Sequence, residues 1–251
     1  MRILISPAKK MRVDTDSFAP ETLPAFLPET QRLLAALQSR TAKELQRLWK
    51  CNDAITALNF RRLETMDLRR QLTPALLSYE GIQYQYMAPG VFDRDQLAYV
   101  QEHLRILSGF YGLLRPFDGV TPYRLEMAAS LSVDGHKDLY AFWGDKLARI
   151  LAGETDLVVN LASKEYSKAV SPHLPPSVTF LTCTFGEEKD GKVVEKGTIC
   201  KMARGEMVRY MAENQITDPE AIKSFDRLNY HFDTDRSDDR TFTFLLNTNG
   251  G

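Results

Sequence analysis

The sequence predicts a mixed α/β fold, organised as a single mixed-sheet domain over residues 1–251 with flanking helices. Short apolar stretches typical of strands alternate with helical patterns along the whole chain, and this interleaving favours a mixed sheet covered by helices. No internal repeat or low-complexity linker divides the chain. Its 251 residues, 43% of them hydrophobic, are enough to bury one large core.

The first half of the chain should begin with a strand and continue mainly as helices. Arg2–Ile5 is a short apolar strand that ends at Ser6-Pro7. Thr41, with Glu44 three residues later, has the form of a capping box that starts a helix. The other elements expected here are a helix over Glu29–Gln38, a helix restarting near Ile55 after a stop at Cys51-Asn52-Asp53, a strand over Ala75–Tyr79, a helix over Arg94–His103 and a strand over Leu104–Leu107.

The second half should alternate more regularly between helices and strands. DLVVNL at Asp156–Leu161 is typical of a buried central strand, and the Asp190-Gly191 pair predicts a hairpin turn. Asp233–Asp239 resembles half of a calcium loop but lacks its glycine and final glutamate, so we interpret it as a solvated acidic loop. The remaining elements expected are helices over Asp138–Leu151, Ser163–Val170 and Lys201–Asn214, and strands over Val178–Phe185, Val193–Ile199 and Thr241–Leu246.

The overall charge gives no support for nucleic-acid binding. The chain holds 32 Lys and Arg against 33 Asp and Glu, with a net charge of -1 and a pI of about 6.4. A basic site must therefore come from local clustering of cations that acids elsewhere balance. No apolar run approaches the roughly 18 residues of a membrane span, and the N-terminal apolar stretch is too short for a secretory signal. We expect a cytoplasmic protein with no membrane partner.

Metal and cofactor chemistry is not indicated by the residue spacing. The three cysteines lie far apart and form no Cys-x-x-Cys pair, which argues against a disulfide framework, a zinc site or an iron–sulfur site. The four histidines are isolated and show no ligand spacing. We therefore predict no metal and no cofactor. No residue is assigned a catalytic role on the sequence pattern alone.

The segment LSGFYGLLRPFDGVTPYRLEM is the most unusual part of the chain. Glycine and proline punctuate it too often for regular structure, yet it is too apolar for a solvated loop. Arg115 and Arg124 lie on either side of Pro116 and Pro122, which partly fix the backbone that carries them, and their planar guanidinium groups suit phosphate. Tyr111 and Tyr123 are candidates for stacking on a ring. Glu126 would orient an arginine or act as a base, although a structural Arg124–Glu126 ion pair explains it equally well.

Three further clusters place cations where an anion would bind. Lys9 and Lys10 follow the first strand, and ligand loops of α/β folds lie at such carboxyl ends. Ser163 is placed as an N-cap after a buried strand, and the next helix should carry its lysines four residues apart on one face. Solvated lysines and close packing remain the alternative reading of each cluster. The cluster residues are Lys9 and Lys10; Ser163, Lys164 and Lys168; and Lys201 and Arg204.

Residues 41–66 predict two short helices joined by a tight turn, a helix-hairpin-helix element inserted in the domain. Such hairpins present backbone N–H groups to phosphate, although any helical hairpin on a protein surface gives a similar pattern. The residues predicted to contact DNA here are Lys50, Asn52, Arg61 and Arg62.

Four blocks in order, MRILISPAKKM, LSGFYGLLRPFDGVTPYRLEM, NLASKEYSKAV and KMARGEMVRYMAEN, resemble the bacterial YaaA family of peroxide stress proteins over essentially the whole chain. The resemblance implies a mixed α/β fold with a basic cleft, a helix-hairpin-helix element, binding of double-stranded DNA and a role in limiting iron-driven oxidative damage. Phe110 stands where an aliphatic residue is expected. The residues that match family motifs are Lys9, Arg115, Arg124, Ser163, Lys164, Lys168, Lys201 and Arg204.

Two functions follow as hypotheses. In the first, the clustered cations contact the phosphates of double-stranded DNA and read its shape rather than its bases, since no helix carries Asn, Gln and Arg arrayed for base edges. In the second, the chain is an enzyme acting on a nucleotide or another phosphorylated small molecule in the same cleft, with Glu126 or Glu165 as general base. Direct iron sequestration is disfavoured because ligand clusters are sparse.

Overall fold

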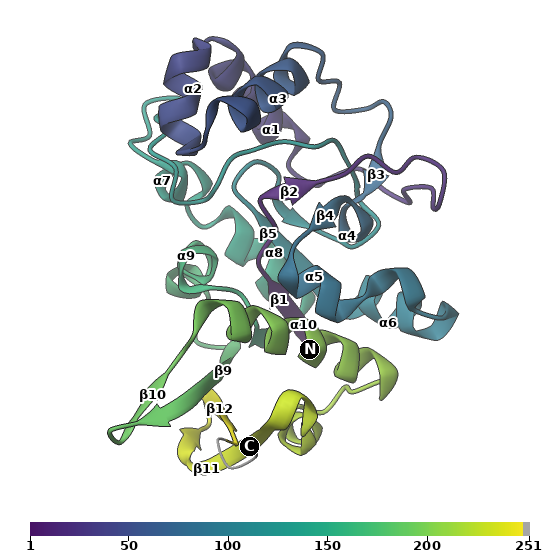
Figure 1. Cartoon of the computed structure of the whole chain (residues 1–251), viewed down its shortest axis with the longest axis vertical. Coiled ribbons are helices and arrows are strands. Elements are labelled where there is room, and N and C mark those ends of the chain that lie inside the picture. Colours follow the sequence, from purple (N-terminus) through teal and green to yellow (C-terminus); the bar gives the residue numbers. More distant parts are fainter. Residues whose placement is uncertain (248–251) are drawn as a thin grey trace.

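The computed structural model describes residues 1–247 and shows a mixed sheet with helices around it. Figure 1 shows the paired helices α2 and α3 at one end of the molecule, α10 across its middle and the C-terminal strands at the other end. The helices are α1 (Leu27–Gln38), α2 (Ala42–Trp49), α3 (Asp53–Glu64), α4 (Ala75–Ser78), α5 (Ile82–Met87), α6 (Arg94–His103), α7 (Leu139–Trp143), α8 (Lys146–Glu154), α9 (Lys164–Ser167) and α10 (Gly197–Glu213), with 3-10 turns at Pro89–Val91, Ser171–His173, Pro219–Ser224 and Arg227–Asn229.

The main sheet has eight strands and mixes parallel with antiparallel pairs, which confirms the predicted fold class. Its order is β11-β12-β9-β8-β1-β5-β6, with β10 paired to β9. All pairs between β12 and β5 along this order are parallel, while β6, β10 and β11 are antiparallel to their neighbours. These strands are β1 (Arg2–Ile5), β5 (Leu104–Ser108), β6 (Gly112–Leu114), β8 (Leu157–Asn160), β9 (Thr179–Lys189), β10 (Lys192–Val194), β11 (Tyr230–Asp238) and β12 (Thr241–Leu246).

Two small sheets brace the loops beside the main sheet. In one, β2 (Lys10–Met11) pairs with β4 (Tyr79–Glu80), and in the other, β3 (Thr73–Pro74) pairs with β7 (Gly119–Val120). Both pairs are antiparallel and only two residues long. They hold the segments before and after α4 against loops that come from distant parts of the chain.

Strand β1 occupies the centre of the sheet because its residues are apolar on both faces. Ile3, Leu4 and Ile5 are fully buried, as is typical of a parallel strand covered on both sides. Ile3 lies opposite Leu104 of β5 on one side and Val159 of β8 on the other. The strand order therefore reverses at β1, which has β5 on one side and β8 on the other. In open α/β sheets, ligand crevices form at such a reversal.

Several predicted elements are confirmed by their end signals. Thr41 accepts from the Glu44 amide and its own amide donates to the Glu44 carboxylate, so the capping box starts α2 as expected. Helix α6 has the predicted bounds Arg94–His103, with Asp93 as a capping-box N-cap. The Asp190-Gly191 turn joins β9 to β10 as predicted, with both residues at positive φ.

Other predicted elements are wrong, for local reasons. Ala75–Tyr79 forms α4 and only the first residue of β4, since a short apolar run does not distinguish a buried helix from a strand. Gly144, at φ +51°, divides the helix predicted over Asp138–Leu151 into α7 and α8. Val193–Ile199 is a strand only to Val194, because α10 already begins at Gly197.

Two further differences concern an acidic segment at the edge of the sheet and a helix that packs against α10. Asp233–Asp239 is not a free acidic loop, because β11 extends through Asp238 and pairs with β12 at the edge of the sheet. Charged residues are common on such edges, where they hinder pairing with other chains. Helix α5, over Ile82–Met87, is not among the predicted elements, although it packs closely against α10.

No helix among residues 1–247 has the length and apolar character that crossing a membrane requires.

Candidate functional site

The floor of the candidate site is formed where β1 and β8 end side by side. Leu161 N–H donates to the Leu4 carbonyl at 2.8 Å, which carries the parallel pairing one step past the end of β8. Ser163 N–H then donates to Ser6 Oγ at 2.9 Å, and the two hydroxyl oxygens lie 3.3 Å apart. This contact fixes the two loops at the carboxyl edge of the sheet, where ligand loops are expected.

A pocket of about 380 Å³ opens above this floor. Its walls come from the loop after β1, from β4 and α5, from residues 123–126, from the loop leading into α9 and from one face of α10. We call it the arginine pocket and define it by the cations that line it. These cations are Lys9, Lys10, Arg124, Lys201 and Arg204.

Carboxylates balance only part of this charge. Three of them, Glu80, Glu126 and Glu165, line the pocket, so its five cations leave a formal excess of two positive charges. Lys10 pairs with Glu80 at 3.0 Å. Glu126 lies between two cations, with one oxygen 2.9 Å from Lys9 Nζ and the other 3.4 Å from Arg124 Nη2.

Arg204 pairs with Glu195 at 3.2 Å, whereas Lys201 forms no ion pair within residues 1–247. Both arginines of the pocket are largely buried, with side chains 11% exposed for Arg124 and 13% exposed for Arg204. A guanidinium held in such surroundings is weakly screened by water, so its attraction for an anion is stronger than on an open surface.

Three buried donors of the pocket-lining residues have no hydrogen-bond partner. They are Nε of Arg124, Nε of Arg204 and Nε2 of Gln83. A buried donor without an acceptor costs about 1–3 kcal/mol, so folded proteins keep few of them, and those that remain call for an explanation such as a ligand or an ion. All three donors belong to residues that line one cationic pocket, which makes these residues candidates for contact with an anion.

Gln83 and Arg204 are held together by an unusually close contact between α5 and α10. Gly205 lies at the crossing, and a methyl group there would overlap the Gln83 carbonyl oxygen and lie 3.0 Å from Met87 N. The glycine in α10 is therefore explained by the close approach of the α5 backbone. This approach brings Gln83 to the same pocket as Arg204.

An aromatic wall completes the pocket. Tyr84, Tyr123 and Tyr166 line it, and burial raises the pKa of each phenol well above its usual value, so all three remain neutral at physiological pH. Tyr123 is only 5% exposed, because its ring stacks on Phe110 and its hydroxyl bonds to Tyr79 and Ser108. Its ring edge therefore contributes to the wall, but most of its faces are already covered.

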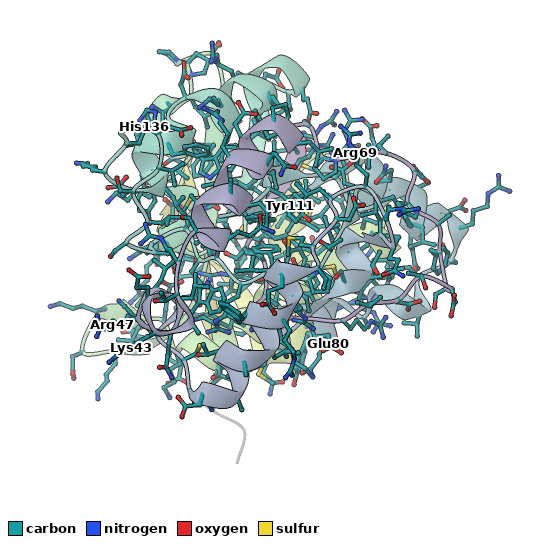
Figure 2. All side chains as sticks on the ribbon, turned by 90° about the horizontal axis from the view of Figure 1, so that it is seen from above. Lys43, Arg47, Arg69, Glu80, Tyr111 and His136 are labelled. Carbon is teal, nitrogen blue, oxygen red and sulfur yellow. The ribbon has the colours of Figure 1, made fainter. Side chains whose placement is uncertain are left out.

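The stacking role predicted for Tyr111 is wrong. Its side chain is fully buried, and Figure 2 shows it near the middle of the molecule, surrounded by other side chains. Its hydroxyl lies 3.2 Å from Thr121 Oγ1 and accepts from the Thr121 amide. Tyr111 thus supports the segment that leads to the pocket without reaching the pocket itself.

The expectation that Arg115 shares the cleft of Arg124 is also wrong. Arg115 lines a separate cavity and pairs with Glu154 of α8 at 3.3 Å. The same carboxylate accepts from Arg105 at 2.8 Å and Arg2 at 3.2 Å. The five residues between Pro116 and Pro122 include β7, whose pairing with β3 carries the chain to a different part of the molecule before Arg124.

Only one residue of the predicted cluster around α9 lines the pocket. Ser163 is the N-cap residue and lines the pocket, but its hydroxyl contacts Ser6 instead of capping the helix. Lys164, the first residue of α9, and Lys168, which follows its end, are exposed and do not line the pocket; Lys168 Nζ lies 4.9 Å from the centre of the Tyr140 ring. Lys9, Lys10, Lys201 and Arg204 all line it as described above.

The α2–α3 hairpin borders the arginine pocket. Arg124 Nη2 donates to the carbonyl of Trp49, the last residue of α2, at 3.5 Å. Lys50 then adopts a left-handed conformation, and Asn52 caps α3 through the Ile55 amide. Lys43 and Arg47 of α2 lie at the periphery of the molecule (Figure 2).

Of the two arginines predicted at the other end of the hairpin, Arg61 is exposed and Arg62 is half-buried. Arg62 donates to the Met11 carbonyl at 3.2 Å and lines a second, wide cavity of about 900 Å³ together with Arg70. Contact of Lys50, Asn52, Arg61 and Arg62 with DNA stays a prediction.

Sequence reasoning missed several pocket residues. Gln83 and Tyr84 lie on the unpredicted α5, and no spacing in the sequence connects them to α10. Glu195 holds Arg204 from the loop before α10. Ser6 carried a usable signal, because it directly follows a buried strand at a position where ligand loops begin.

Comparison with known proteins finds a family and relatives that match nearly the whole chain. Residues 1–236 match the family model described as peroxide stress protein YaaA. The chain is 54% identical to a UPF0246 protein of Pediococcus pentosaceus over 98% of both chains. It is 53% identical to a UPF0246 protein of Agathobacter rectalis, over 97% of this chain and 98% of the relative.

Proposed function

The chain belongs to the peroxide stress protein YaaA family, and on this premise we propose that its arginine pocket binds a nucleotide phosphate. The observation that carries the proposal is the set of three unpartnered buried donors, on Gln83, Arg124 and Arg204. Phosphate has the oxygen atoms to satisfy several donors at once, and arginine contacts it through two parallel hydrogen bonds. Lys9 and Lys201 add charge at the same place.

Double-stranded DNA is the first candidate source of this phosphate. The pocket is too small for a duplex, so one nucleotide unit would enter it while the neighbouring phosphates lie on the rim. The α2–α3 hairpin borders the pocket through the Arg124–Trp49 contact, and the exposed Lys50, which directly follows Trp49, would add a cation to that rim. Phosphate contacts position a duplex without reading its sequence, so recognition would follow DNA shape. A protein bound in this way would limit iron-driven oxidation by covering the DNA.

The second candidate source of the phosphate is a free nucleotide or another phosphorylated small molecule, on which the chain would act as an enzyme. The pocket volume of about 380 Å³ lies in the range typical of small-molecule sites. Glu126 and Glu165 also place carboxylates beside the cations, where one of them would serve as general base. These two observations favour a small ligand over a polymer.

A salt titration distinguishes the two sources. For duplex DNA, we expect the logarithm of the binding constant to fall linearly with the logarithm of salt concentration, with a slope of about -0.9 for each phosphate neutralised. The measurement is fluorescence anisotropy of a labelled duplex at several salt concentrations, with thermal shift of the same protein by mononucleotides.

Each outcome has a defined meaning for the proposal. Affinity for duplex that does not change with salt rules out the first source. Stabilisation by a mononucleotide, without any by duplex, favours the second. If neither a duplex nor a mononucleotide binds, the arginine pocket is not a nucleotide phosphate site.

A further inference from the structure

Glu165 differs from the other acids of the arginine pocket in how it is held. It is the second residue of α9, and its Oε1 accepts a hydrogen bond from the Ala128 amide at 3.0 Å. Its backbone carbonyl accepts from the Tyr140 hydroxyl at 2.9 Å. The Ala128 amide therefore orients the carboxylate, the Tyr140 hydroxyl holds the backbone of the same residue, and the second carboxylate oxygen is left for another donor.

The other carboxylates near the pocket each neutralise a cation. Glu80 pairs with Lys10, Glu126 with Lys9 and Arg124, and Glu195 with Arg204. Within residues 1–247, Glu165 forms no ion pair with a lysine or arginine. A positioned carboxylate that does not balance the protein's own charge is free to accept hydrogen bonds from a ligand.

We propose, building on the nucleotide phosphate site above, that Glu165 selects ligands whose base carries an amino group. An ionised carboxylate only accepts hydrogen bonds, so it pairs with the amino group of adenine or cytosine and repels the carbonyl oxygen at the same position of hypoxanthine or uracil. The phosphate lies at Arg124 and Arg204, and the base extends along the aromatic wall to Glu165. The ligand class is a nucleotide unit with an exocyclic amino group.

The expected selectivity follows from the strength of hydrogen bonds to charged groups. The adenine nucleotide should bind about 10- to 100-fold more tightly than the hypoxanthine nucleotide, since one charge-assisted hydrogen bond is gained and one acceptor–acceptor repulsion is avoided. The same ratio is expected for cytidine over uridine monophosphate. Inorganic phosphate, which lacks a base, should bind weakly and should not respond to changes at Glu165.

The test is calorimetric titration of the full chain with adenosine, inosine, cytidine and uridine monophosphates and with inorganic phosphate. Glu165→Gln should reduce the preference for amino bases to less than about threefold, because an amide both donates and accepts. Glu220→Gln, which changes an exposed carboxylate of the 3-10 turn at Pro219–Ser224, is the matched control and should keep the wild-type ratios. Thermal unfolding of each variant checks that the fold is retained.

The outcomes separate this inference from the proposed function. Equal affinity of the wild-type chain for adenosine and inosine monophosphates overturns the role of Glu165 and leaves the phosphate site standing. An unchanged preference in Glu165→Gln also overturns it. Failure of all four mononucleotides to bind overturns it as well, and the duplex titration then decides separately whether the pocket binds phosphate at all.

Discussion

Replacing Arg124 and Arg204 together by alanine is expected to weaken nucleotide or duplex binding by about 100- to 10,000-fold, since hydrogen bonds to a charged partner contribute about 1.5–3 kcal/mol each. Both guanidinium groups line the arginine pocket, and each carries a buried Nε without a partner. Fluorescence anisotropy or calorimetry on the purified double variant measures the loss. Thermal unfolding of the same variant checks that the fold is retained, because Glu126 keeps its ion pair with Lys9 while Glu195 loses its partner Arg204.

Arg115→Ala is the matched control for this prediction. Arg115 comes from the same glycine- and proline-rich segment as Arg124, but its side chain is 51% exposed and pairs with Glu154 in a separate cavity. Its loss should change affinity by less than about threefold, since exposed ion pairs and isolated surface charges contribute little. If Arg115→Ala weakens binding as much as the double variant, the arginine pocket is not the place where the anion binds.

Gly205→Ala should both destabilise the chain and weaken ligand binding. The added methyl group would overlap the Gln83 carbonyl oxygen, so α5 and α10 would have to separate. Overpacking costs typically 1–3 kcal/mol, and the upper end is expected here because the atom displaced belongs to the backbone. The helical preference of alanine recovers only about 1 kcal/mol.

The result should be a fall in the melting temperature of roughly 4–8 °C, at about 2–4 °C for each kcal/mol in a chain of this size. Because Gln83 would move with α5, nucleotide affinity should also fall. Gly153→Ala is the control: this glycine lies in α8 with no atom within 4 Å of the added methyl group, so alanine should stabilise the chain slightly. A Gly205→Ala chain as stable as Gly153→Ala would contradict the close contact between α5 and α10.

Elements with local end signals could be predicted from the sequence, and those that depend on tertiary contacts could not. The α2 capping box and the Arg2–Ile5 strand have their own residue patterns. By contrast, α4 is a short apolar segment whose amides bond to the Pro116 and Asp118 carbonyls, some forty residues away. Helix α5 is short and depends on α10 for its packing, so no periodicity reveals it.

The same distinction explains which residues of the site could be predicted from the sequence. Lys9 and Ser163 follow buried strands, and the position of strand ends in an α/β sheet makes such residues candidates. Arg115 has the same local surroundings as Arg124, and only the pairing of β7 with β3 sends them to different cavities. The contribution of Gln83 arises from a helix crossing at Gly205, which nothing in its own neighbourhood indicates.

If the arginine pocket holds a nucleotide phosphate, a crystal structure of the chain with adenosine monophosphate should place the phosphate there. We expect phosphate oxygens within about 3.2 Å of the guanidinium nitrogens of both Arg124 and Arg204. A nucleotide whose phosphate lies instead against Lys164 and Lys168, or beside Arg115 and Glu154, would show that the anion binds elsewhere.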